Sequence, residues 1–134
     1  MSPAQSVQQA MRAALIARTQ LTSLLGGAHI FDEAPRGANP PYVVFGAIET
    51  KDWSVADQKA HELIVTLEIT TNARARQLAQ NIANEIETAL DGAVLTLTDH
   101  RLVNLRAVFN NVSKSIITAN FNGVVRFRAA TEPL

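Results

Sequence analysis

Three histidines, His29, His61 and His100, are the only side chains that could act as imidazole bases near neutral pH. No two of them lie within helical reach of each other, and residues of expected strands or loops flank each one. This spacing favours histidines at the surface or at a sheet edge. The alternative is an enzyme in which His61 or His100 acts as a general base with a nearby acid, but the sequence indicates no substrate.

The other reactive residue types do not form a recognised site either. Gly26-Gly27 is not followed by the GK[ST] of a phosphate-binding loop, and the chain has no HExxH or GxSxG motif. The adjacent acids Asp32 and Glu33 point in opposite directions if the chain is extended, so they cannot act as a pair. The sequence therefore predicts no catalytic, metal-binding or cofactor-binding residue, and we expect a protein that is not an enzyme.

A different chemistry, the burial of apolar surface between proteins, is indicated by the stretch FDEAPRGANPPYVVFG at residues 31–46. Pro40 and Pro41 each fix φ and withhold a backbone donor, so the chain enters the next strand along one defined path. The apolar run from Tyr42 to Phe45 predicts a strand that is buried on both faces, which suits a sheet centre or a subunit contact.

Trp53 is the only tryptophan, and it lies between Asp52 and Ser54 in the most polar loop of the chain. Large aromatic side chains on loops often anchor protein contacts, because they bury much area for little loss of entropy. The alternative is a tryptophan that folds back on its own core. We take the following residues as interface candidates: Pro40, Pro41, Tyr42, Phe45, Asp52 and Trp53.

A group of arginines is the second candidate for a contact surface. Arg126 and Arg128 share one face of an expected strand, and Arg106 can lie across from them on the neighbouring strand. One interpretation is a solvated sheet face on which these arginines pair with Glu62 and Glu68. The other is a basic stripe, Arg106, Arg126 and Arg128, that meets an acidic partner subunit or DNA that passes without sequence-specific contacts.

Two amphipathic helices must position these residues. Ser2, Pro3 and Gln5 predict a capped start for a first helix over residues 3–25, which Gly26-Gly27 ends. Asn72 can cap a second helix over residues 73–90, with a stripe of large aliphatic residues at four-residue steps.

Strands fill the rest of the sequence. Alternating apolar residues predict a half-buried strand over 61–70, preceded by a hairpin arm or loop over 49–60. Other strands are expected at 42–48, 101–109 and 119–129, with a short edge piece at 94–97. The last turn lies either at Asn122-Gly123 or, as we favour, at residues 110–115 with Gly123 as a bulge in one long final strand. The order predicts an α+β fold, a mostly antiparallel sheet with two amphipathic helices on one face.

Composition narrows the function classes further. A chain of 134 residues is expected to form one domain, residues 1–134. Because it has no cysteine, disulfides and thiolate metal sites are excluded. Twelve basic and twelve acidic residues balance, so no overall field draws the chain to DNA or to an anionic membrane. With no signal peptide and no membrane-length apolar run, we expect a soluble cytoplasmic product or part of an assembly made there.

Several segments resemble one known family. They are FDEAPRGANPPYVVFG, Asp52-Trp53-Ser54, His61-Glu62-Leu63 and the closing GVVRFRA at residues 123–129. In order and spacing they are similar to the small tail-completion or tail-terminator proteins of long-tailed phages and gene transfer agents, the DUF3168 family. The resemblance covers nearly the whole chain. One departure is Asn120-Phe121-Asn122, which is less charged than the family pattern.

The resemblance implies a structural role that the residues alone do not show. Such proteins are similar to terminators that form a ring, expected to be a hexamer, which caps the tail tube and joins it to the head-tail connector or stopper protein, with DNA passing through the lumen. The expected location is the tail or neck of a virion or phage-like particle, assembled in the host cytoplasm. The alternatives are a head-tail connector or tube subunit, or a non-viral module that binds a small ligand or peptide.

Overall fold

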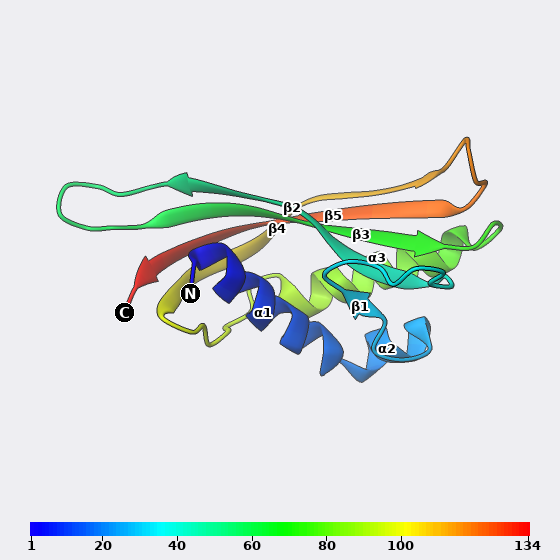
Figure 1. Cartoon of the computed structure of the whole chain (residues 1–134), viewed down its shortest axis with the longest axis horizontal. Helices are drawn as coiled ribbons and strands as arrows, with labels where there is room; N and C mark the ends of the chain where they lie inside the picture. The colour runs from blue at the N-terminus through cyan, green and yellow to red at the C-terminus, as the bar shows by residue number, and fades with distance from the viewer.

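The computed structural model describes all 134 residues as one layer of helices on one five-stranded sheet (Figure 1). The strand order is β1-β2-β3-β5-β4; β1 runs parallel to β2 and every other pair is antiparallel. The expected α+β class is thereby confirmed. The elements are α1 Pro3–Ile16, α2 Thr19–Leu25, β1 Ile30–Phe31, β2 Tyr42–Asp52, β3 His61–Thr71, α3 Arg76–Leu90, β4 His100–Lys114 and β5 Phe121–Pro133.

The predicted start of the first helix is confirmed. The Ser2 hydroxyl accepts from the Gln5 amide at 3.1 Å, and the Gln5 side chain accepts from the Ser2 amide at 3.0 Å, which completes a capping box. Pro3 is the first helical residue, and Gly26 adopts the left-handed conformation that ends α2.

The single helix predicted over residues 3–25 is wrong, because the chain breaks at Ala17 and Arg18 into α1 and α2. Leu15 and Leu21 are both fully buried but are six residues apart, so a straight helix would turn Leu21 toward solvent. The break rotates α2 so that both reach the core. Arg18 at the break donates through Nε to Glu85 Oε2 of α3 at 2.7 Å, which holds the corner.

The second predicted helix exists but begins later, at Arg76. Asn72 does not cap it with its side chain; its carbonyl instead accepts from the Ala75 amide at 3.1 Å in a turn. Arg74 has a positive φ of 69°, so the backbone between Asn72 and the start of α3 is not helical. Of the predicted stripe of Leu78, Ile82, Ile86 and Leu90, the last three are buried and Leu78 is partly buried. Ala79 and Ala83 are buried beside them.

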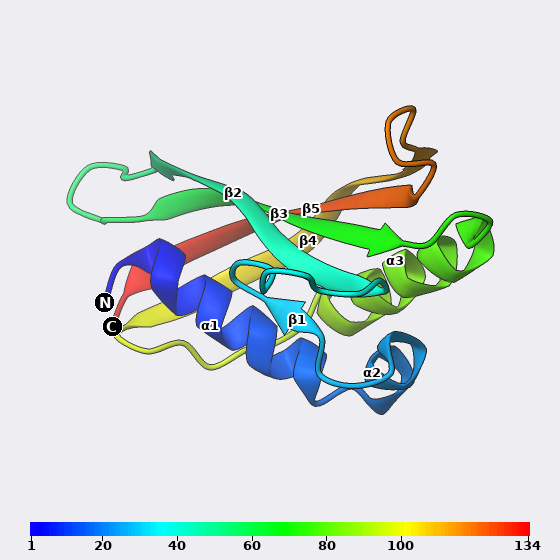
Figure 2. The same ribbon diagram turned by 45° about the vertical axis from the view of Figure 1, so that its right-hand side comes forward.

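The strand at Tyr42 is not buried on both faces, which corrects that prediction. Val43 and Phe45 are buried under the helices, whereas Tyr42 and Val44 are half-buried on the opposite face. The reason is that all the helices cover the same face of the sheet (Figure 2). β2 also continues beyond the predicted end to Asp52, because it pairs with β3 along its whole length.

β3 confirms the alternation read from the sequence, with Leu63, Val65, Leu67 and Ile69 all in the core. β2 and β3 therefore form a long hairpin whose tip extends past the helices at one end of the sheet (Figure 1). β4 and β5 form a second long hairpin whose turn projects at the opposite end (Figures 1 and 2).

The favoured interpretation of the last turn is partly confirmed. Gly123 lies inside β5, paired with Ile69 and Val112, but the pairing there is regular and shows no bulge. The turn lies later than predicted, from Ser115 to Asn120. Glycine at position 123 leaves room for the buried Ile69, because an added Cβ would lie only 3.0 Å from its Cδ1.

The predicted edge piece at residues 94–97 forms no strand beyond a single bridge between Thr96 and Arg101. The two residues that directly follow α3 bind the outer edge of β4 instead. The Gly92 amide donates to the Leu105 carbonyl at 2.7 Å, and Asp91 Oδ1 accepts from the Ala107 amide at 3.0 Å. The rest of that edge, from Val108 onward, has no neighbouring strand. None of the helices is long and apolar enough to span a membrane.

Candidate functional site

The structure does not gather the three histidines into one centre. Nδ1 of His29 lies 2.9 Å from the Leu25 carbonyl, and Nε2 of His100 lies 2.9 Å from the Met1 carbonyl. His61 begins β3, and no hydrogen bond links any of the three to an acidic side chain. No group of three or more His, Cys, Asp or Glu side chains is placed to hold a metal ion.

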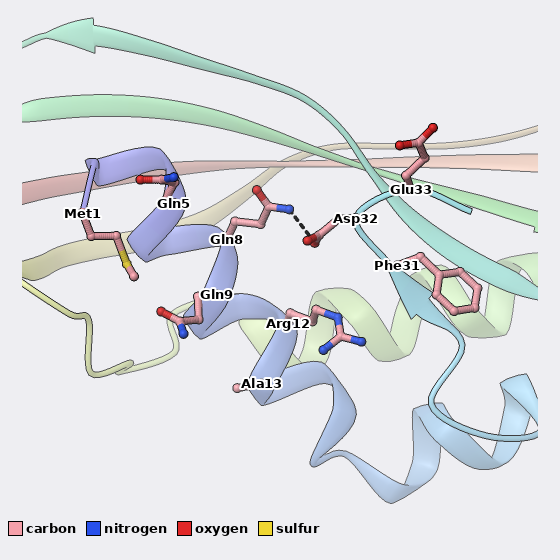
Figure 3. A pocket seen from close by; sticks show the side chains of 9 residues that line it. All are labelled: Met1, Gln5, Gln8, Gln9, Arg12, Ala13, Phe31, Asp32 and Glu33. Carbon is pink, nitrogen blue, oxygen red and sulfur yellow. Dashed lines mark hydrogen bonds between the residues drawn. The ribbon is translucent and has the colours of Figure 1, made fainter. Parts of the chain in front are cut away.

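An open groove of about 750 Å³ lies between α1 and the end of β1 with the residues that follow it (Figure 3). Gln8 donates to Asp32 Oδ1 across it at 2.7 Å, and Arg12 donates through Nε to the Ile30 carbonyl at 2.9 Å. Asp32 and Glu33 lie in a bend after β1, not in extended chain, and the Glu33 carboxylate points away from Asp32 (Figure 3). The groove can hydrogen-bond a polar group, but its two carboxylates do not converge on one point.

The tip of the β2–β3 hairpin is ordered by its own hydrogen bonds. Val55 and Gln58 exchange two backbone bonds at 3.0 and 2.9 Å, and the Trp53 amide donates to the Ala60 carbonyl at 2.8 Å. Asp52 Oδ1 accepts from the Ser54 amide at 2.9 Å. Hydrogen bonds from Ser54, aided by the nearby His61, lower the pKa of Asp52 below its usual value, because they favour the charged form.

Trp53 and Arg128, which the sequence placed in separate groups, meet in the structure. The Arg128 guanidinium lies over the Trp53 ring, 5.0 Å from its centroid, and also donates to Glu62 Oε2 at 3.2 Å. Trp53 remains 46% exposed, so it partly covers its own sheet and still offers a large aromatic surface to another molecule. The structure thus shows the contact with its own sheet, and the interface role of this tryptophan stays a prediction. The pairing was missed because position 53 lies beyond the strand predicted from the sequence.

The predicted basic stripe lies on the face of the sheet opposite the helices. Arg106 and Arg128 are direct cross-strand partners, and Arg126 pairs with Phe109, whose ring its guanidinium covers at 4.6 Å. Of the ion pairs expected on a solvated face, the one with Glu62 is formed by Arg128 at 3.2 Å, whereas no arginine forms an ion pair with Glu68.

Charges of both signs lie on this open face. Arg106, Arg126 and Arg128 lie on β4 and β5, and Glu49, Glu62 and Glu68 lie on β2 and β3. Each half also carries an opposite charge, since Lys51 on β2 is the cross-strand partner of Glu62 and Glu132 on β5 forms an ion pair with Arg101.

The remaining interface candidates differ in accessibility. Phe45 is 5% exposed within the core, so its side chain does not reach the surface. Tyr42 is half-buried with its ring 6.3 Å from that of Phe31, and Pro40 and Pro41 lie in the loop that leads into β2.

Two exposed, adjacent isoleucines were not predicted from the sequence. Ile116 and Ile117 form the tip of the β4–β5 hairpin and are 100% and 89% exposed. The signal was present as two neighbouring aliphatic residues after Ser115, a residue type common in turns. It was missed because the turn was placed several residues too early.

The sequence model of the family described as tail completion protein gp17 matches residues 9–132. Among solved structures, a chain of the virion of a native gene transfer agent (GTA) particle has a TM-score of 0.88 and 26% sequence identity, over 96% of this chain and 96% of that chain. No curated protein matches the sequence.

Proposed function

Because this chain belongs to the tail completion protein gp17 family, we propose that it closes the end of a phage-type tail as a ring of identical subunits. The coarse role follows from the family and the gene transfer agent match: the protein is a structural component of a virion tail. The proposal adds a ring of six copies that caps the tail tube, joins it to the head-tail connector or stopper protein, and leaves a lumen for DNA.

The shape of the subunit supports assembly into a ring. Two long hairpins project at opposite ends of one sheet, so each copy can reach a neighbour in two directions (Figure 2). A ring needs such head-to-tail contacts, in which two different surfaces of each copy meet. The unpaired edge of β4 from Val108 onward is one surface of the kind that neighbouring chains use for contact.

The charge on the open sheet face supports contact with a neighbour and weak contact with DNA. Arg106, Arg126 and Arg128 can meet glutamates on β2 and β3 of another copy. Where they face the lumen, nearby glutamates offset their charge. Strong phosphate binding needs many uncompensated Lys and Arg side chains, so this face would allow DNA to slide through.

The mass of the purified protein under native conditions tests the ring. Six copies of a 14.5 kDa chain give about 87 kDa, and class averages from electron microscopy should show a closed ring with a central hole. A chain that stays monomeric at high concentration and is missing from purified particles would contradict the proposal. Labelling of the particle separates a terminator, at the head-proximal end of the tail, from a connector or a tube subunit.

A further inference from the structure

Two stretches at the edges of the sheet have backbone groups without a neighbouring strand. On β2, the strand β1 pairs only with Val43 and Val44, so residues 46–52 are free on that side. On β4, the segment that follows α3 binds the edge as far as Ala107, so residues 108–114 are free. The two free stretches are equal in length. An unpaired edge of this kind is a template for pairing with another chain.

Backbone groups that point to the free side alternate along each stretch. The Trp53 amide donates across the β2–β3 hairpin, so the even-numbered residues within 48–52 direct their groups away from β3. The Ser115 amide donates across the β4–β5 hairpin, so the even-numbered residues within 110–114 direct theirs away from β5. In both stretches the same residues carry their side chains on the helix-covered face. The two stretches can therefore pair with all helices on one side of a continued sheet.

Strand directions fix how such a pair forms. β2 and β4 run in opposite directions, because three antiparallel pairs join them through β3 and β5. Copies related by rotation about the axis of a ring keep their strand directions along that axis. β4 of one copy therefore meets β2 of the next copy as an antiparallel pair. Because two different edges meet, each open chain of copies keeps a free edge at both ends until a ring closes.

Side chains favour one register, in which Asn111 lies opposite Glu49 of the next copy. Both free stretches are then paired from end to end. Val112 lies opposite Ile48 in this register, so two partly buried aliphatic side chains meet on the helix-covered face. A shift by two residues would instead place Val112 opposite the exposed, polar Thr50.

The positions of the two stretches match the tilt that a closed ring of strands needs. Through the pairs across the sheet, Glu49 is level with Arg106 within one copy. The proposed partner Asn111 lies roughly 13–16 Å further along β4, a range that allows for the bulge between them. Over four strands at a spacing of about 4.8 Å, this shift tilts the strands by about 35–40°, as in closed barrels. Registers two residues away would give about 20–27° or about 46–50°.

The direction of the shift decides which face of the sheet lies inside. β3, α3 and β4 form a crossover connection, which is right-handed, so β4 lies to the right of β3 when β3 runs upward and the helices face the viewer. The free stretch of β4 is then at the upper right and that of β2 at the lower left. Strands seen from outside a barrel lean to the right as they rise, because of their right-handed twist, and each copy is then joined higher along the strand. The helices therefore lie outside, and the open face lines the lumen.

We propose that residues 108–114 of β4 pair antiparallel with residues 46–52 of β2 in the next copy, with Asn111 opposite Glu49. The inference rests on the ring proposed above and names the contact that closes it. It also turns the basic stripe toward the lumen. The contact is a single strand pair about 23 Å long, so it adds to the surface buried elsewhere between the copies and does not replace it.

The chain contains no cysteine, which allows a direct test by disulfide cross-linking. Protein carrying Asn111→Cys is mixed with protein carrying Glu49→Cys under oxidising conditions, and covalent dimers are read on a non-reducing gel. The two residues form a pair without mutual hydrogen bonds, at a Cα distance of about 4.5 Å that a disulfide can span. We expect a dimer from this mixture and none from Ser113→Cys with Glu49→Cys, whose Cα atoms lie about 8 Å apart.

Asn110→Pro tests the backbone hydrogen bonds of the contact. The Asn110 amide points to the free edge, so proline there leaves the bonds between β4 and β5 in place. We expect self-association to weaken at least about tenfold while the monomer stays folded, because a donor is lost and its acceptor stays buried without a partner. Asn110→Ala is the matched control. It removes the same side chain but keeps the amide, and it should keep the ring.

The outcomes separate this contact from the ring itself. A wild-type ring that gives no cross-link at position 111, or gives it at position 113 instead, overturns the inference and leaves the ring intact. An Asn110→Pro variant that assembles like the wild type does the same, as does equal loss of assembly in Asn110→Pro and Asn110→Ala. If Asn110→Pro does not fold, the cross-link alone decides. A wild-type monomer rejects the ring, and this contact with it.

Discussion

Replacing Trp53 with alanine separates the two roles of this residue. The exposed 46% of the ring corresponds to about 115 Å² of a side chain that offers about 250 Å². If a neighbour covers this surface, its burial contributes at most about 3 kcal/mol per contact, at about 25 cal/mol per Å². Trp53→Ala is therefore expected to raise the dissociation constant between subunits by up to roughly 100-fold.

The same change also affects folding. Within the chain, alanine at this position removes the cation–π interaction with Arg128, and an interaction of this kind at an exposed site contributes about 0.5–1 kcal/mol. It also removes the part of the ring that the chain itself covers, about 135 Å², whose burial contributes at most about 3 kcal/mol. Trp53 lies near the hairpin tip, which can open locally while the core stays folded, so part of this loss does not affect global unfolding. We expect the free energy of unfolding of the monomer to fall by about 1–3 kcal/mol.

Analytical ultracentrifugation over a concentration series measures the first effect, and urea denaturation of dilute protein measures the second. Trp53→Phe is the matched control, since it keeps an aromatic ring over Arg128 and should retain most of the association. If Trp53→Ala lowers the melting temperature but leaves the ring unchanged, the tryptophan belongs to its own sheet and the anchor hypothesis is wrong.

Three further changes test other parts of the structure. Gly123→Ala should lower the free energy of unfolding by about 1–3 kcal/mol, because the added methyl group meets the buried Ile69 side chain. Gly46→Ala is the control and should be near neutral, since its methyl group meets only the movable Glu68 side chain. Equal losses for the two variants in urea denaturation would contradict this explanation. Ser2→Ala removes the side-chain cap of α1 and should lower the free energy of unfolding by about 1 kcal/mol in the same assay. An unchanged free energy would show that the cap does not stabilise the protein. Arg126→Glu combined with Arg128→Glu should leave a folded monomer but reduce particle yield; a normal yield would assign both arginines to a solvated face.

Local signals in the sequence specified the elements that depend on near neighbours. The Ser2 cap, the alternation from Leu63 to Ile69 and the aliphatic stripe of α3 were all predicted correctly, because each pattern is complete within a single helix or strand. The fold class followed from their order. The family resemblance was likewise confirmed, since it depends on motifs along the chain and not on contacts between distant residues.

Contacts between distant residues decided the rest. The helix break at Arg18 brings two leucines to one core, and the extension of β2 to Asp52 needs β3 as its partner. That extension places Trp53 over Arg128, so two candidate groups that are far apart in the sequence become one surface. The sequence by itself determined which side chains avoid water within each element. Only the tertiary structure determined which of them stay exposed at the two hairpin tips, because exposure depends on what the rest of the chain leaves uncovered.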